Sequence, residues 1–146
     1  MTDEVEVCVI GGGPAGAALA TRLAGLGHQV VVVEQHRFPR PHIGESLSPA
    51  IWPLLESLGV RDRVAARGFT QAVRARVRWR GADEERVAVG DGLTVDRGAF
   101  DAILLHRARE AGAEVLSPAT ARRPARSGAG WAVPLGGRVL QARFLA

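Results

Sequence analysis

The sequence predicts a mixed α/β fold built on a strand–helix–strand unit near its start. Residues 5–10 form a short apolar run rich in β-branched side chains, which is typical of a buried parallel strand. Residues 30–33 are four valines, a second such run, and Glu34 follows them directly. Between the runs, residues 14–26 show helical spacing, and the face expected to be buried is Ala15, Leu19, Leu23 and Leu26. Two buried strands joined through a helix make a parallel βαβ unit.

The turn before this helix fits the pattern G-x-G-x-x-G at Gly11, Gly13 and Gly16. In this pattern the first glycine permits a tight turn, the second lets a pyrophosphate approach the bare backbone, and the third lets the helix pack closely. Pro14 suits the first helical turn, whose unpaired N–H groups favour an anion. The Glu34 carboxylate can accept hydrogen bonds from ribose hydroxyls and would repel a 2′-phosphate. The sequence therefore predicts an adenine-dinucleotide site that disfavours NADP.

Composition limits the class of protein. The chain has 146 residues, 47% of them hydrophobic, which is enough for one domain with a core. It contains no run of 18 apolar residues and no charged-then-apolar leader, so we expect no membrane span and a cytoplasmic location. Cys8 is the single cysteine, and His36 and His42 have no cysteine or carboxylate pair nearby, so we expect neither a disulfide nor a metal site.

The basic residues do not indicate nucleic-acid binding. All 19 are arginine, yet the net charge is only +4 and aromatic residues make up 5% of the chain. No predicted helix collects arginines into a stripe, and such a protein would need a basic patch with aromatic stacking platforms. We therefore expect no nucleic-acid partner.

The segment after the second strand, residues 35–47, is expected to be an extended loop because prolines flank Arg40 on both sides. Arg40 could pair with a pyrophosphate, Gly44 permits close approach to a flat ring, and Ser46 offers a hydroxyl or an N–H. The alternative is a proline-rich surface loop with a solvated arginine. Residues 44–48 lack the final glycine of a nucleophile elbow, so a serine hydrolase is not expected.

The rest of the chain predicts a hairpin, three helices and further strands. Arginine alternates with apolar residues over 73–80, which predicts a half-buried strand that turns at 81–85 and pairs with 86–89. This arginine face is either solvated or meets an anionic substrate, NAD(P)H or a protein partner. The other predicted elements are helices over 51–58, 61–67 and 97–111 (the last capped by Asp96), strands over 93–95 and 114–116, and a meander over 119–126, 131–135 and 138–145.

Two segments resemble a known family. The first is Glu34 followed by Arg37-Phe38-Pro39-Arg40 and His42-Ile43-Gly44-Glu45-Ser46-Leu47, and the second is Val95-Asp96-Arg97 with Phe100-Asp101. Both resemble the start of the FAD-dependent oxidoreductases grouped with p-hydroxybenzoate hydroxylase. The likeness is nearest to the branch that holds the flavin-dependent halogenases and the geranylgeranyl-reductase-like enzymes.

The resemblance implies a Rossmann-like FAD-binding fold with a β-meander and part of an inserted substrate-side β-hairpin, incomplete at the C-terminus. Residues 1–146 would form an incomplete FAD-binding domain, residues 68–95 the inserted hairpin, and FAD is the implied cofactor. In the family, the position matching Arg97 lies near the flavin phosphates and ribityl chain, and the backbone around Thr120 and Ala121 passes the adenine. The candidate cofactor-binding residues are Gly11, Gly13, Pro14, Ala15, Gly16, Glu34, Gln35, Arg40, Gly44, Ser46, Arg97 and Ala121.

The resemblance also implies a flavin-dependent oxidoreductase as the full-length parent of this chain. It would act on a small organic substrate and take electrons from NAD(P)H or a separate flavin reductase, and no residue is assigned a catalytic role. Halogenases of the branch place a lysine where our matching puts Gln71, and this chain has no lysine. A monooxygenase or reductase is therefore favoured over a halogenase. A catalytically inactive nucleotide-binding fragment and a flavoprotein that modifies a partner protein remain alternatives.

Overall fold

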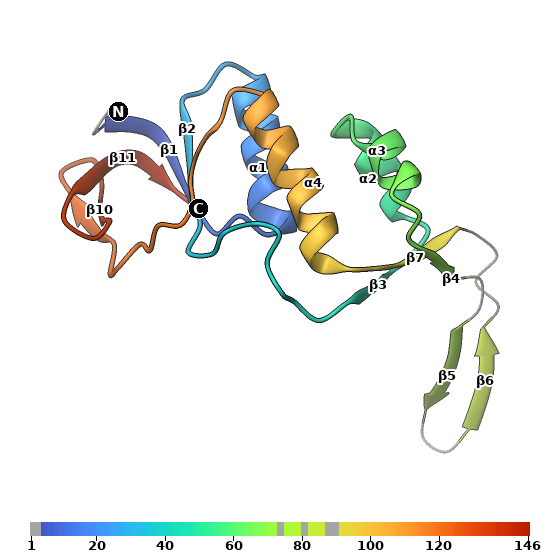
Figure 1. The fold of residues 1–146 in the computed structure, drawn as a ribbon. Helices are drawn as coiled ribbons and strands as arrows, with labels where there is room; N and C mark the ends of the chain where they lie inside the picture. Colours follow the sequence, from blue (N-terminus) through green and yellow to red (C-terminus); the bar gives the residue numbers. More distant parts are fainter. Residues whose placement is uncertain (1–3, 73–74, 80–81, 87–90) are drawn as a thin grey trace. The chain divides into compact units, whose positions relative to one another are not determined.

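A computed structural model describes residues 4–72, 75–79, 82–86 and 91–146 of the chain (Figure 1). The chain divides into two compact units. The first joins Met1–Arg40 with Asp101–Ala146, and the second is Pro41–Phe100. The predicted hairpin insertion over residues 68–95 lies within the second unit, and its status as a separate insertion stays a prediction.

A six-stranded sheet forms the first unit, in the order β8-β2-β1-β11-β10-β9. β1 (Glu4–Ile10), β2 (Val30–Val33), β8 (Glu114–Leu116) and β11 (Val139–Leu145) run parallel, and β10 (Gly130–Pro134) and β9 (Ala125–Ser127) continue the sheet antiparallel. The βαβ unit and the parallel strand at 114–116 are thereby confirmed. The predicted first meander strand is shorter than expected, because residues 119–124 are not in a strand.

The core of the first unit is built from strand side chains. Strands with both faces covered can carry continuous apolar runs, and all four valines of β2 are buried. Cys8 on β1 is completely buried, and its burial raises the pKa of the thiol to about 11. It is therefore a neutral, small hydrophobic residue at physiological pH, as expected. The core cluster consists of Val5, Cys8, Val31, Val33, Val133, Leu135, Leu140 and Ala142.

Helix α1 (Pro14–Gly25) connects β1 to β2 (Figure 1), but its buried face differs from the predicted one. Leu19 and Leu26, expected to be buried, are 37% and 72% exposed. The reason is Gly16, where a Cβ atom would overlap the carbonyl oxygen of Gly11. The helix packs so closely on the end of β1 that only small side chains fit beneath it. The residues that it buries are Ala17, Ala20 and Thr21.

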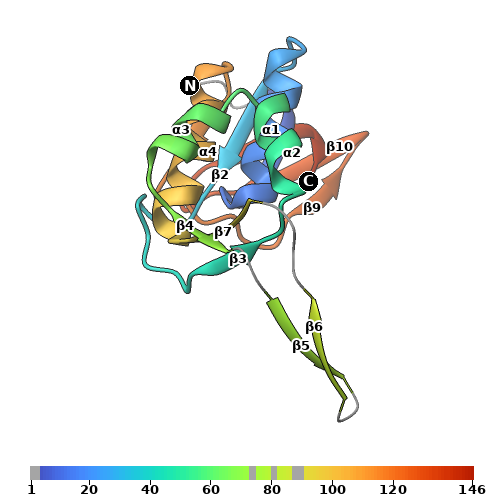
Figure 2. The ribbon, with the colours of Figure 1, turned by 90° about the vertical axis from the view of Figure 1, so that its right-hand side faces the viewer.

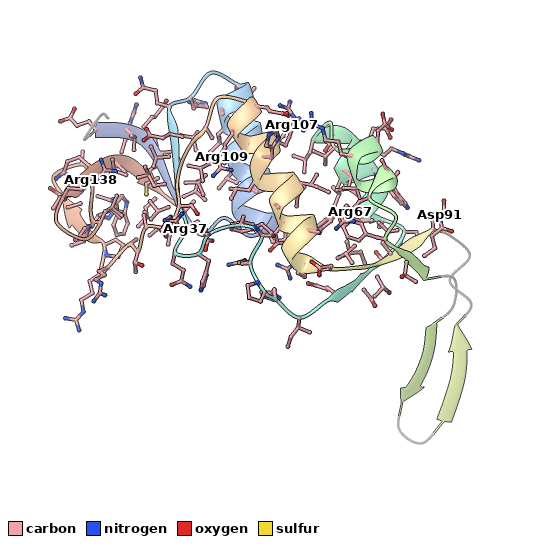
Figure 3. All side chains as sticks on the ribbon, viewed as in Figure 1. Arg37, Arg67, Asp91, Arg107, Arg109 and Arg138 are labelled. Atoms are coloured by element: carbon pink, nitrogen blue, oxygen red, sulfur yellow. The ribbon has the colours of Figure 1, made fainter. Side chains whose placement is uncertain are left out.

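Helix α4 (Arg97–Glu110) begins in the second unit and continues in the first from Asp101 onward. The predicted cap is confirmed, because Oδ1 of Asp96 accepts a hydrogen bond from the Ala99 N–H at 2.8 Å. Figure 3 shows Arg107 and Arg109 projecting from this helix. Its buried side chains include the apolar Phe100, Leu104, Leu105 and Ala108, and also the carboxylate of Asp101.

The second unit contains a small antiparallel sheet in the order β3-β7-β4, visible in Figure 2. Its strands are β3 (Glu45–Leu47), β4 (Thr70–Ala72) and β7 (Gly92–Val95), and its helices are α2 (Ile51–Ser57) and α3 (Arg61–Ala66). The loop predicted to run to residue 47 therefore ends in a strand. None of the helices in the described ranges has the length and apolar character required to span a membrane.

The predicted hairpin is present as β5 (Ala75–Trp79) paired antiparallel with β6 (Ala82–Arg86). Ala75 lies opposite Arg86 and Trp79 opposite Ala82, so the return strand starts at residue 82 instead of 86. The turn predicted over residues 81–85 is therefore too long, because residues 82–85 belong to β6. Residues 73, 74, 80, 81 and 87–89 of the predicted hairpin lie outside the described part of the chain.

Candidate functional site

The glycine turn between β1 and α1 has the backbone geometry that its sequence predicts. Gly11 has φ of +107°, a conformation that favours glycine. Gly13 is the N-cap residue of α1, and the nearest atom to a Cβ placed there would be Nη2 of Arg40 at 3.4 Å. No side chain in the described part of the chain caps the start of α1, and Pro14 occupies its first turn. Backbone N–H groups at this helix start are therefore available to an anion.

Glu34 closes one side of the turn at the carboxyl end of β2. Its side chain is only 2% exposed, and its two oxygens accept hydrogen bonds from the backbone N–H groups of Gly12 at 2.8 Å and His36 at 2.7 Å. Burial alone would raise the pKa of this carboxyl. The two hydrogen bonds and the positive charge of Arg40 outweigh that effect and bring the pKa below its ordinary value. Glu34 is thus ionised at neutral pH and fixed in position.

Arg40 lies between two buried carboxylates. Its Nη1 is 3.5 Å from Oε1 of Glu34, and its Nη2 is 3.3 Å from Oδ2 of Asp101. The side chain is 16% exposed, and its guanidinium also lies over the ring of Phe38, 5.1 Å from the centroid. Nε of Arg40 is buried and has no hydrogen-bond partner among the described residues. The alternative of a solvated surface arginine is therefore wrong.

The sequence analysis missed Asp101, which is completely buried. A signal for it existed, because Asp101 lies in the helix predicted over 97–111, next to Phe100 and three residues before Leu104. A carboxylate is rarely buried without a cationic partner. What the sequence did not reveal is that its partner is Arg40, 61 residues away.

A cavity of about 230 Å³ opens beside the glycine turn and the end of β2. The Ala119 N–H donates a 2.8 Å hydrogen bond to the carbonyl oxygen of Glu34, which holds the segment after β8 against this cavity. Binding pockets for whole drug-sized ligands are typically about 300–1,000 Å³, so this one suits one end of a dinucleotide. It is lined by Ile10, Gly11, Gly13, Val33, Glu34, Gln35, Arg40, Ala119, Thr120 and Ala121.

Six of the twelve predicted site residues line this one cavity: Gly11, Gly13, Glu34, Gln35, Arg40 and Ala121. Pro14, Ala15 and Gly16 do not line it, but they form the adjoining first turn of α1. The remaining three, Gly44, Ser46 and Arg97, belong to the second unit. The first unit alone thus brings together the strand end, the glycine turn and the acidic residue.

The three residues of the second unit have partners within that unit. A Cβ at Gly44 would lie 3.0 Å from the carbonyl oxygen of Val95, so close packing on β7 already requires a glycine. The Ser46 hydroxyl is 3.4 Å from that of Thr94. Nη1 of Arg97 donates to Oε2 of Glu45 at 2.5 Å. These contacts give each position a structural role, and a role toward a cofactor stays a prediction.

Comparison with known proteins decides the family. Residues 4–124 match the family described as FAD binding domain. The chain belongs to that family. This FAD-binding domain has the predicted Rossmann-like fold, its cofactor is FAD as expected, and the resemblance to FAD-dependent oxidoreductases near the halogenase branch is confirmed.

Its relatives include halogenases. It is 38% identical over 120 residues to a tryptophan 2-halogenase of Chondromyces crocatus, covering 80% of this chain and 23% of the relative. It is 38% identical over 123 residues to the flavin-dependent halogenase armH4 of Armillaria mellea, covering 76% and 23%. The solved structure of the myxobacterial chondrochloren halogenase CndH superposes with a TM-score of 0.84 at 29% identity, covering 99% of this chain and 37% of that one. The chain spans about a quarter of the length of these curated relatives.

Proposed function

We propose that this chain is the part of a flavin-dependent halogenase that binds the adenosine and diphosphate of FAD. Support for the reaction comes from relatives at 38% identity, both named as halogenases. They point away from the monooxygenase or reductase that the sequence analysis favoured. Support for the binding site comes from the cavity that adjoins the glycine turn, the Glu34 carboxylate and Arg40.

The residues of the first unit fit the parts of FAD. The bare backbone of Gly13 and the uncapped start of α1 suit a diphosphate. Nε of Arg40 is a buried donor that still lacks a partner, and a phosphate oxygen would supply one. Oε2 of Glu34 accepts the Gly12 N–H and keeps a lone pair for a ribose hydroxyl, whereas Oε1 already faces His36 and Arg40. Ala119, Thr120 and Ala121 also line the cavity, and we assign the adenine to their side of it.

When bound, FAD supplies the redox chemistry, and the protein binds and orients the cofactor. In the first unit, the fixed groups hold the nucleotide end and need little reorganisation, because the strand end and the helix start are already in place. Glu34 has a lowered pKa and therefore stays an acceptor for ribose at neutral pH. The unit supplies no group that we assign to the reacting end of the cofactor.

The test uses the protein expressed from its full gene. Flavin released by gentle denaturation should be FAD at about one equivalent per chain, measured by absorbance and chromatography. The reduced enzyme, supplied with oxygen, chloride or bromide and a panel of indoles, phenols and pyrroles, should give a halogenated product by mass spectrometry. Absence of flavin contradicts the site, and an oxygenated product without halogen contradicts the reaction.

The electron donor forms a further part of the proposal. We expect a separate flavin reductase to deliver the reducing equivalents, because a relative at 38% identity is named a flavin-dependent halogenase. Turnover should then require both NADH and a reductase. Rapid oxidation of NADH by the protein alone would show direct reduction and favour a monooxygenase.

A second candidate is a flavin-dependent oxidoreductase that does not halogenate. The observation that favours it is Gln71, at the position matched to the halogenase lysine in a chain without lysine. Gln71 lies on β4 and lines a cavity of about 200 Å³ in the second unit with Trp52 and Phe69. Its amide can form hydrogen bonds but cannot supply an ammonium group. Gain of halogenation in Gln71→Lys, from a wild-type protein that only oxygenates, would establish this candidate.

A further inference from the structure

We propose that Asp101 is a positioning residue for the cofactor, which fixes the orientation of the Arg40 guanidinium for the diphosphate. The inference rests on the proposed function, because it places the diphosphate at the glycine turn. Asp101 itself does not contact the cofactor in this proposal. It acts through Arg40.

The geometry around Arg40 carries the argument. Its Nη2 lies 3.3 Å from Oδ2 of Asp101, and its Nη1 lies 3.5 Å from Oε1 of Glu34. Two terminal nitrogens held by two different carboxylates fix both the place and the plane of a rigid, planar group. Both carboxylates are almost fully buried, at 0% and 2% exposure, so neither can exchange Arg40 for water without a large cost.

The guanidinium of Arg40, held by these two carboxylates, lies beside the glycine turn. Its Nη2 would be 3.4 Å from a Cβ built at Gly13, and Arg40 lines the same cavity as Gly11 and Gly13. Nη2 carries a second N–H besides the one that it donates to Asp101, and the buried Nε has no partner in the described part of the chain. A buried donor without a partner is costly, and a ligand oxygen would remove that cost.

The charges around Arg40 explain why the orientation of its guanidinium matters, and not only its neutralisation of the diphosphate charge. Arg40, Glu34 and Asp101 together carry a net charge of about −1 when both carboxyls are ionised. A diphosphate would add further negative charge, so the group as a whole does not attract it by its net charge. Directed N–H groups from Arg40 and from the start of α1 then have to provide the recognition.

The central experiment measures ADP and adenosine affinity by calorimetry, on apoprotein prepared from the full gene. Adenosine keeps the base and ribose and lacks the phosphates. Asp101→Asn keeps the side-chain size and removes the charge. We expect it to weaken ADP binding by about tenfold, the scale of one charge-assisted hydrogen bond, and adenosine binding by less than about twofold. Glu110→Gln, an exposed carboxylate on the same helix, is the control and should change neither.

A double-mutant cycle tests whether Asp101 acts through Arg40. In an Arg40→Gln background, Asp101→Asn should change ADP affinity by less than about twofold. An equal loss of ADP and adenosine affinity, or a full further loss in the Arg40→Gln background, would show that Asp101 only supports the fold and would overturn the proposal.

A second variant covers the case in which Asp101→Asn does not fold. Asp101→Glu keeps the charge and moves the carboxylate by one methylene, so we expect an ADP-specific loss with the cooperative unfolding transition retained. An unchanged ratio of ADP to adenosine affinity in that variant would overturn the proposal. Wild-type apoprotein that binds neither ADP nor FAD would contradict the proposed function instead, so the two failures are distinguishable.

Discussion

The glycine turn of the first unit and the Gly44–Arg97 region of the second unit were both expected to bind the cofactor, and they differ in what their polar groups still require. At the turn, Arg40 has a buried donor without a partner among the described residues, and a Cβ at Gly13 would meet only Nη2 of Arg40, at an ordinary contact distance of 3.4 Å. In the second unit, Arg97 is paired with Glu45, and Gly44 is required by packing on β7. An unsatisfied buried group indicates a ligand, whereas a satisfied one already has a structural explanation.

The largest expected effect separates a packing glycine from an open one within α1. Gly16→Ala forces a Cβ against the carbonyl oxygen of Gly11, so we expect a loss of about 3 kcal/mol or more in unfolding free energy. Gly25, at the other end of the helix, has nothing within 4 Å of a built Cβ. Gly25→Ala should be neutral or stabilise by up to about 1 kcal/mol. Urea unfolding measures both, and equal stability in the two variants would contradict the close packing at Gly16.

The second prediction compares the two arginines directly. Arg40→Gln should weaken ADP binding by about 2 kcal/mol and also lower stability, because it leaves two buried carboxylates without their cation. Arg97→Gln should leave ADP affinity within about twofold, since its guanidinium is paired with Glu45 inside the second unit. Calorimetric titration with ADP and thermal unfolding distinguish the two. Similar losses of ADP affinity in both variants would place Arg97 at the nucleotide end of the cofactor and would contradict the difference that we propose between the two regions.

The third prediction compares Gly44, where close packing requires a glycine, with Gly13, where we propose that a glycine leaves the backbone accessible to the diphosphate. Gly44→Ala brings a Cβ to 3.0 Å from the Val95 carbonyl oxygen, so we expect a stability loss of about 1 kcal/mol. Gly13→Ala meets only Nη2 of Arg40 at 3.4 Å, the end of a side chain, and should cost little stability. It should instead weaken ADP binding, because a methyl group then occupies the approach to the backbone. Stability and affinity are measured on both variants, and the reverse pattern would contradict the assignment.

The smallest expected effect is a pH dependence of stability from Glu34. Its folded pKa is lowered from 4.5, so its contribution to stability is present above about pH 4.5 and is lost as the pH falls through the folded pKa. Glu34→Gln should lose less stability than the wild type between pH 7 and pH 3. Thermal midpoints over this range, at constant ionic strength, test the difference. Parallel pH curves for the two proteins would show that Glu34 does not contribute.

The sequence alone predicted much of the site because its key signals are local. A positive φ at Gly11, a helix that starts at Pro14 and an acid directly after β2 follow from residues within one βαβ unit. Such features depend on backbone sterics and on short spacings that a sequence pattern records directly. The cap at Asp96 belongs to the same class, because its partner is three residues away.

Only the tertiary structure decided which distant groups meet. It paired Arg40 with Asp101 across 61 residues, placed β11 next to β1, and turned the small residues of α1 toward the sheet. Local patterns do not encode these outcomes, because they depend on how closely whole elements approach and on which buried charges must find a partner. The sequence determined where a diphosphate has room at the backbone, and the packed fold determined which cation lies beside it.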